Sequence, residues 1–144
     1  MESLMKSVLV HAPIEEVYGY LSDPTHLPEI WPSLVEITDV HSLPNGGHSN
    51  HWAYKMAGIR LEGTSEDVEH AANERIVSKT KGGTESTQTW TVQPEGDDTK
   101  VTFKVDYAVP IPVLGRLAEA AIVKLNDHEG DAIVANLKTI LEAH

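Results

Sequence analysis

Residues Lys100–Val109 read KVTFKVDYAV, and their side chains alternate between apolar and polar at every second position. Val101, Phe103, Val105 and Tyr107 fall on one face of an extended chain, and the polar residues between them fall on the other. Because successive side chains of a strand point to opposite faces, this pattern predicts a strand with one buried face and one solvated face. Such a strand is typical of an antiparallel sheet that is covered on one side only.

The same period of two extends upstream from this segment. Short loops rich in Gly, Pro, Asn and Asp, such as Pro44–Gly47 and Lys81–Thr84, separate the alternating runs. Together with an N-terminal run of β-forming residues, this spacing predicts a seven-stranded antiparallel sheet. The predicted strands are residues 3–10, 34–40, 51–56, 59–69, 75–80, 86–93 and 100–109.

Helical signals occupy two places in the chain. After the first strand, residues 12–21 and 24–30 predict two short helices, and Pro13 suits the first position of a helix. After Pro110 and Pro112, apolar residues keep a period of 3.6 over residues 113–143, which predicts a single helix about 45 Å long with a bend or weak point at Gly130. The order indicates one α+β domain over residues 1–144.

The order of these elements, with several short motifs in sequence, resembles the START-like (SRPBCC) superfamily with its helix-grip fold, and in particular the polyketide cyclase/dehydrase branch. The motifs are Val10–Val17, Asp23-Pro24, Leu27-Pro28 with Trp31, Gly96–Val101, Ile111–Leu117 and Asn136–Lys138. The resemblance implies a curved sheet with the long helix packed across its concave face. It also implies a cavity for a small hydrophobic ligand such as a lipid, an isoprenoid or quinone, or a polyketide-like molecule.

Large aromatic residues on the predicted inner face of the sheet stand opposite small residues of the long helix, as the lining of a pocket would. Ordinary interdigitation in a filled core would give the same pattern. The residues expected to line the cavity are Trp52, Tyr54, Met56, Trp90, Val101, Phe103, Val105, Tyr107, Leu117, Ala121 and Leu125. Those expected at its mouth are Leu27, Ile30 and Trp31.

The charge of the chain narrows the possible partners. Its 22 acidic and 11 basic residues give a net charge of −11, which disfavours binding to nucleic acid and to anionic membranes. The chain has no cysteine, which excludes disulfides and thiolate chemistry. No stretch of about 20 apolar residues predicts membrane insertion. Because the N-terminal residues do not have the pattern of a signal peptide, we expect a cytoplasmic protein; a protein partner stays an open question.

Catalytic and metal-binding signals are sparse. Acid–base candidates are Asp67, His128 and Tyr54, where Asp67 would face inward only if a bulge near Ser65 reversed the strand. The loop histidines show no metal-ligand spacing, and the sequence predicts no metal and no cofactor. Three functions therefore stay open: binding of a hydrophobic ligand for transport or sequestration, a cyclase or dehydratase on an aromatic or polyketide substrate, and a partner-binding module with a filled core.

Overall fold

The computed structural model describes residues 2–56, 58–109 and 119–143. The strands are β1 (Glu2–Val10), β2 (Leu34–Ser42), β3 (His48–Met56), β4 (Ile59–Ala71), β5 (Arg75–Gly82), β6 (Ser86–Glu95) and β7 (Asp98–Tyr107). The helices are α1 (Ile14–Ser22), the 3₁₀ helix η1 (Pro24–His26), α2 (Leu27–Ile30) and α4 (Glu119–Leu141). This order confirms the predicted α+β helix-grip class with its seven strands.

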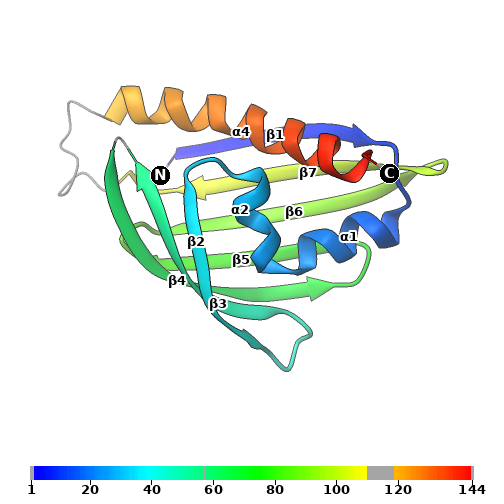
Figure 1. The fold of residues 1–144 in the computed structure, drawn as a ribbon, viewed down its shortest axis with the longest axis horizontal. Helices are drawn as coiled ribbons and strands as arrows, with labels where there is room; N and C mark the ends of the chain where they lie inside the picture. The colour runs from blue at the N-terminus through cyan, green and yellow to red at the C-terminus, as the bar shows by residue number, and fades with distance from the viewer. Residues whose placement is uncertain (1, 57, 110–118, 144) are drawn as a thin grey trace.

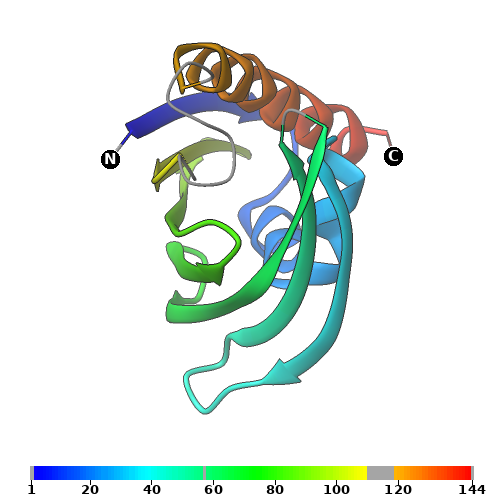
Figure 2. The same ribbon diagram turned by 90° about the vertical axis from the view of Figure 1, so that its left-hand side faces the viewer.

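The seven strands form one antiparallel sheet in the order β1-β7-β6-β5-β4-β3-β2. Figures 1 and 2 show that this sheet curls strongly and that α4 runs along β1 across the open side of the curve. The short helices α1 and α2 lie inside the curve. Irregular pairing between β2 and β3 at two places, near Leu34 and near Thr38, helps this edge to bend, because a bulge increases the local twist.

The alternation predicted for residues 100–107 is confirmed in β7. Val101, Phe103, Val105 and Tyr107 are buried, while Lys104 on the opposite face is exposed. β7 pairs with β1 on one side and β6 on the other, so it is the second strand from one edge of the sheet and has no free edge of its own.

The single helix predicted over residues 24–30 is divided in the structure into η1 and α2. Pro28 has no amide hydrogen, so it cannot donate to the carbonyl of Pro24 and continue an α-helical pattern. The amide of Leu27 donates to Pro24 instead, which closes a 3₁₀ turn before α2 begins. Pro28 then stands in the first turn of α2, where its missing hydrogen costs nothing.

Helix α4 continues through Gly130 without interruption, where the sequence predicts a bend or weak point. Gly130 is buried against β1, and an added Cβ would lie 3.1 Å from the Cδ1 atom of Leu4 and 3.2 Å from the Cγ atom of Lys6. The glycine therefore allows the helix to approach the strand closely. Lys6 reaches past it to pair with Asp127 and Asp131 on α4, each at 3.1 Å.

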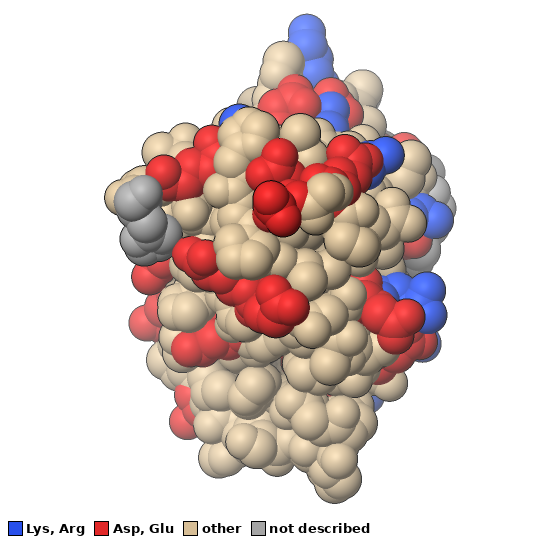
Figure 3. Space-filling model, turned by 90° about the vertical axis from the view of Figure 1, so that its right-hand side faces the viewer, with Lys and Arg blue, Asp and Glu red and all other residues tan. Residues whose placement is uncertain are grey.

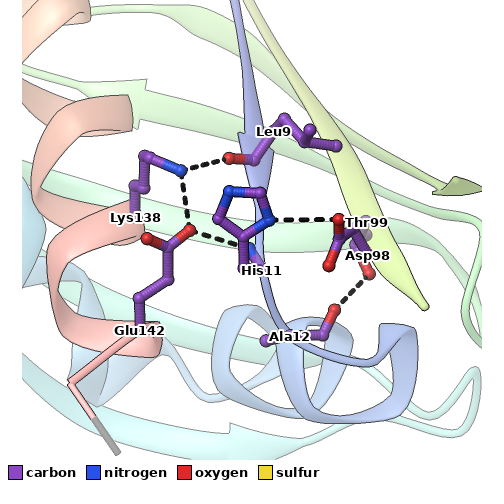
Figure 4. Close-up of polar contacts among 7 residues, drawn as sticks. All are labelled: Leu9, His11, Ala12, Asp98, Thr99, Lys138 and Glu142. Carbon is purple, nitrogen blue, oxygen red and sulfur yellow. Dashed lines mark hydrogen bonds and ion pairs between the residues drawn. The ribbon is translucent and has the colours of Figure 1, made fainter. Parts of the chain in front are cut away.

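The end of α4 is fastened to the end of β1 by a group of polar contacts (Figure 4). Lys138 Nζ donates to the carbonyl of Leu9 and to Glu142 Oε2, both at 2.7 Å. The same carboxylate oxygen accepts from the backbone amide of His11 at 2.7 Å. The His11 ring in turn lies 3.0 Å from Asp98 at the start of β7. These contacts fix the helix relative to the wall that it covers.

The buried apolar residues form two separate clusters. The larger contains residues of α1, β1, β5–β7 and the C-terminal half of α4. The smaller contains Trp52, Met56, Leu61 and Ile122, with Leu34, Ile37 and Tyr54 packed against it. The core is thus divided between the two ends of the curved sheet, and a cavity lined by residues of both clusters lies between them.

Candidate functional site

A cavity of about 90 Å³ lies between the two clusters. One water molecule needs roughly 10–15 Å³ measured in this way, so the space would hold about six to nine of them. The expectation of a completely filled core does not describe this interior. The lining residues are Leu4, Leu27, Trp31, Leu34, Ile37, Asn50, Trp52, Tyr54, Met56, Ser65, Thr80, Thr84, Ser86, Gln88, Phe103, Val105, Tyr107, Asn126, Glu129 and Ile133.

Many of the residues selected from the sequence line this cavity. They are Trp52, Tyr54, Met56, Phe103, Val105 and Tyr107 from the sheet, with Leu27 and Trp31 from α2 and its end. Trp31 lies edge-on to both Tyr54 and Phe103, with ring centroids 6.2 and 5.4 Å apart. The rings therefore form an aromatic corner between α2 and the inner face of the sheet.

Three other selected residues lie in the packed core instead. Trp90 stacks on Phe103 with ring centroids 4.0 Å apart, and it belongs with Val101 to the larger cluster. Ile30, expected at the cavity mouth, is fully buried in the same cluster. Neither Trp90, Val101 nor Ile30 is among the residues that line the cavity.

The predicted face of the long helix needs correction. Leu125 is 57% exposed and Ala121 is also exposed, so neither side chain faces the cavity. Leu117 lies outside the described residues. The face that does line the cavity carries Asn126, Glu129 and Ile133. These three positions lie on one face of the helix, but two of them are polar. A search for apolar residues at helical spacing therefore selects the neighbouring face, which carries Ala121 and Leu125.

Two of the three acid–base candidates lie away from the cavity. Asp67 is half-buried outside the cavity lining, where its Oδ2 atom accepts from the amide of His48 at 2.8 Å and its Oδ1 atom accepts from Ser78 Oγ at 2.6 Å. Asp67 thereby fastens the loop between β2 and β3 to the sheet. His128 is exposed on α4. Tyr54 is the candidate that lines the cavity.

The carboxylate of Glu129 is the polar centre of one cavity wall. Its Oε1 atom accepts from the indole Nε1 of Trp31 and from the hydroxyl of Tyr54, both at 2.7 Å. Its Oε2 atom accepts from the amide of Ser33 at 3.1 Å and from the Ser33 hydroxyl. Four donors therefore surround the two oxygens, which matches the acceptor capacity of a carboxylate. The cluster joins α4 to β3 and to the segment that follows α2.

Burial raises the pKa of Tyr54 above its ordinary value of 10.0, and the nearby Glu129 carboxylate raises it further. The hydroxyl therefore remains protonated at neutral pH and acts as a hydrogen-bond donor. Sequence reasoning missed Glu129 because acidic residues usually lie on the exposed face of a helix. Its spacing of four residues from Ile133 was the available signal, since both lie on one stripe of α4.

A row of polar side chains crosses the opposite wall. Asn50 pairs with Ser65, Ser65 with Thr80, Thr80 with Ser86, and Ser86 with Tyr107 in successive strands. All five residues line the cavity. The hydroxyl groups of Thr80 and Ser86 hydrogen-bond each other at 2.8 Å. The cavity thus has an apolar body with a polar group of residues on each of two walls.

The described part of the cavity lining is free of cationic side chains. Among the described residues that surround it, none is Lys, Arg or His. Across residues 2–56, 58–109 and 119–143, no three His, Cys, Asp or Glu side chains converge as a metal site requires. None of the helices in these ranges is long and apolar enough to cross a bilayer.

Solved structures with the same fold cover almost the whole chain. TTHA0849 from Thermus thermophilus aligns with 21% identity over 99% of this chain and 98% of its own, with a TM-score of 0.84. The Zhui aromatase/cyclase from Streptomyces sp. R1128 aligns with 16% identity over 99% and 96%, with a TM-score of 0.75. A START superfamily protein from Mycobacterium smegmatis aligns with 19% identity over 98% and 97%, with a TM-score of 0.73.

These identities are low, so the likeness establishes the fold. A comparison with curated proteins finds no match. The family model described as polyketide cyclase / dehydrase and lipid transport matches residues 1–142. The chain therefore belongs to the polyketide cyclase / dehydrase and lipid transport family, and it has the START-like helix-grip fold.

Proposed function

We propose that this protein binds a small, electrically neutral, hydrophobic molecule in the cavity between β3 and α4. The observation that carries the proposal is the division of the core into two apolar clusters with a lined space between them. A concave, mostly apolar site with a few polar groups is the usual form of a small-molecule site. The family, whose description includes lipid transport, supports the same class of ligand.

The charges around the site favour a neutral ligand over an anion. Glu129 carries a carboxylate into the cavity wall, and no described lining residue supplies a positive charge. Acidic side chains also predominate over basic ones on the face shown in Figure 3. A fatty-acid carboxylate would lose its hydration in this site without gaining an ion pair, which is costly. An alcohol, ketone or quinone of similar size avoids that cost.

The expected affinity follows from the area that such a ligand buries. Covering about 400 Å² of apolar surface contributes about 10 kcal/mol at ~25 cal/mol per Å². The loss of translational and rotational freedom costs at least ~4 kcal/mol. The balance corresponds to a dissociation constant of tens of micromolar, about 40 μM. This affinity needs no catalytic machinery and suits reversible transport or sequestration.

The test is a fluorescence titration with N-phenyl-1-naphthylamine, a neutral dye that emits more strongly in apolar surroundings. We expect saturable binding of one dye per chain and displacement by 1-dodecanol. Dodecanoate, which has the same chain length and a carboxylate, should compete at least about tenfold more weakly, because no described lining residue offers it a cation. Absence of saturable binding, or equal competition by the acid and the alcohol, would contradict the proposal.

A catalytic role for the same cavity is the second candidate. It is favoured by one observation, the meeting of two titratable groups, Glu129 and Tyr54, at 2.7 Å in the cavity wall. In this arrangement all four acceptor positions of Glu129 are occupied, so the carboxylate must release a donor before it can accept a substrate proton. Conversion of a linear triketone, lost in Tyr54→Phe while dye affinity is kept, would establish catalysis.

A further inference from the structure

Two buried polar atoms in the residues that line the cavity lack a hydrogen-bond partner within residues 2–56, 58–109 and 119–143. They are the Oδ1 atom of Asn50 and the Nε1 atom of Trp52. Asn50 is 8% exposed and Trp52 is 5% exposed, and both residues line the cavity. A third buried atom of this kind, Nδ1 of His48, belongs to a residue outside the lining. Buried polar atoms are nearly always paired, so this acceptor and this donor indicate a missing partner.

Both residues are held firmly in place by the sheet. They stand two positions apart on the inner face of β3, which places their backbones about 7 Å apart. Trp52 pairs with Gly63 on β4, where an added Cβ would lie 2.5 Å from the Cζ2 atom of the indole. The ring therefore rests against bare backbone. Gly63 cannot supply a side-chain partner for the indole nitrogen.

Several of the neighbouring polar groups are engaged with one another or with Glu129. Thr80 and Ser86 hydrogen-bond each other, and Gln88 donates to Ser86 at 3.4 Å. At the other wall, Trp31 and Tyr54 donate to Glu129. Among the described residues, the indole of Trp52 has no acceptor, while the indole of Trp31 donates to Glu129. The buried lining atoms with unmet hydrogen-bonding capacity in this part of the chain therefore belong to Asn50 and Trp52.

We propose that Asn50 and Trp52 form a subsite for a hydroxyl group of the ligand, which donates to Asn50 Oδ1 and accepts from Trp52 Nε1. The inference rests on the proposed function, because it names the polar group of the molecule that the cavity binds. A hydroxyl group both donates and accepts at one oxygen atom, whereas a ketone or an ether only accepts. It also satisfies the amide of Asn50 in either orientation of its oxygen and nitrogen. The ligand class is therefore a hydrophobic alcohol or phenol.

The test compares 2-naphthol with naphthalene, which differ by one hydroxyl group. On the native protein, we expect 2-naphthol to bind about tenfold more tightly, the effect of one net hydrogen bond. In two-dimensional ¹H–¹⁵N NMR spectra, only 2-naphthol should move the Trp52 indole proton strongly downfield, with the signal assigned from Trp52→Phe. Equal affinities with an unmoved indole signal would overturn the subsite and leave hydrophobic binding intact. Failure of both compounds to bind would overturn the proposed function itself.

Two variants test whether the preference for 2-naphthol depends on Asn50. Asn50→Leu keeps a similar volume and removes the acceptor, so the preference for 2-naphthol should fall to about twofold or less. Met56→Leu is the matched control, since Met56 lines the same cavity from the same strand and has no strong polar group. It should keep the tenfold preference. A preference that survives in Asn50→Leu would overturn the assignment; if that variant does not fold, the indole signal of the native protein decides the matter.

Discussion

The hydroxyl of Tyr54 on β3 donates a 2.7 Å hydrogen bond to Glu129 on α4, two residues separated by 75 positions in the chain. This bond joins the wall of the sheet to the helix that covers it, across the edge of the cavity. Both residues of this bond line the cavity, so the contact that positions the helix is also part of the cavity wall. If the cavity binds a ligand as proposed, stability and binding should be coupled at this point.

Glu129→Leu should lower the free energy of unfolding by about 3 kcal/mol, because it leaves the donors of Trp31, Ser33 and Tyr54 without an acceptor. Tyr54→Phe removes one of the donors and should cost about 1 kcal/mol. Urea denaturation followed by circular dichroism measures both. A Glu129→Leu protein as stable as the native one would show that the carboxylate cluster does not hold the helix.

Gly63→Ala should be strongly destabilising, by about 3 kcal/mol or more, since overpacking against backbone has no easy relief. The added Cβ would lie 2.0 Å from the carbonyl oxygen of Lys81 and 2.5 Å from Trp52. Gly19→Ala in α1 is the control, because nothing lies within 4 Å of its added Cβ. That change should raise stability by about 0.5–1 kcal/mol. Thermal melting checks the prediction: the melting temperature should fall in Gly63→Ala and rise in Gly19→Ala, relative to the native protein.

Substitutions at Ile122 and Leu125 test which face of α4 is buried. Ile122 is 1% exposed and packs with Trp52 and Met56, so Ile122→Ala should cost about 2–4 kcal/mol. Leu125→Ala should change stability by less than about 0.5 kcal/mol, since Leu125 is largely in solvent. Equal losses in chemical denaturation would mean that the helix is rotated from the orientation described.

The polar group at the end of α4 predicts a dependence on acid pH. The hydrogen bond from the His11 amide, and then the contact with Lys138, lower the pKa of Glu142 below its ordinary value of 4.5. A lowered carboxyl pKa contributes stability above pH 4.5 that is lost as the pH falls through the lowered value. The difference in stability between the native protein and Glu142→Gln should therefore be larger at about pH 7 than at about pH 3. A difference that does not change with pH would contradict this assignment.

The sheet could be predicted because its signal is local. Alternation in residues 100–107 and the turns between strands specify which side chains share a face, and packing then follows. The lining of the cavity was predictable on the sheet side for the same reason, as Trp52, Phe103 and Tyr107 show. The helix side was not, because its inward face includes Asn126 and Glu129, whose partners lie far away in the sequence. Hydrogen bonds between residues far apart in the chain produce no periodic pattern in the sequence.

The two unpaired atoms of Asn50 and Trp52 could not be found from the sequence either. An Asn two positions before Trp52 on a strand suggests a paired core residue as readily as a site. Their unpaired state is seen only in the fold, where Gly63 faces the indole, the hydroxyl groups of Thr80 and Ser86 pair with each other, and no side chain of the described ranges hydrogen-bonds the two atoms. The absence of a partner is a property of the assembled fold.

Binding of the neutral dye by two matched variants tests the central proposal most directly. Asn126→Trp places a large ring on the helix face that lines the cavity, and Leu125→Trp places the same ring one residue away, on the exposed face. With both variants folded as judged by circular dichroism, we expect dye affinity to fall at least about tenfold in Asn126→Trp, an energy of ~1.4 kcal/mol, and to stay unchanged in Leu125→Trp. Unchanged affinity in Asn126→Trp would show that the dye binds elsewhere and that this cavity is not the binding site.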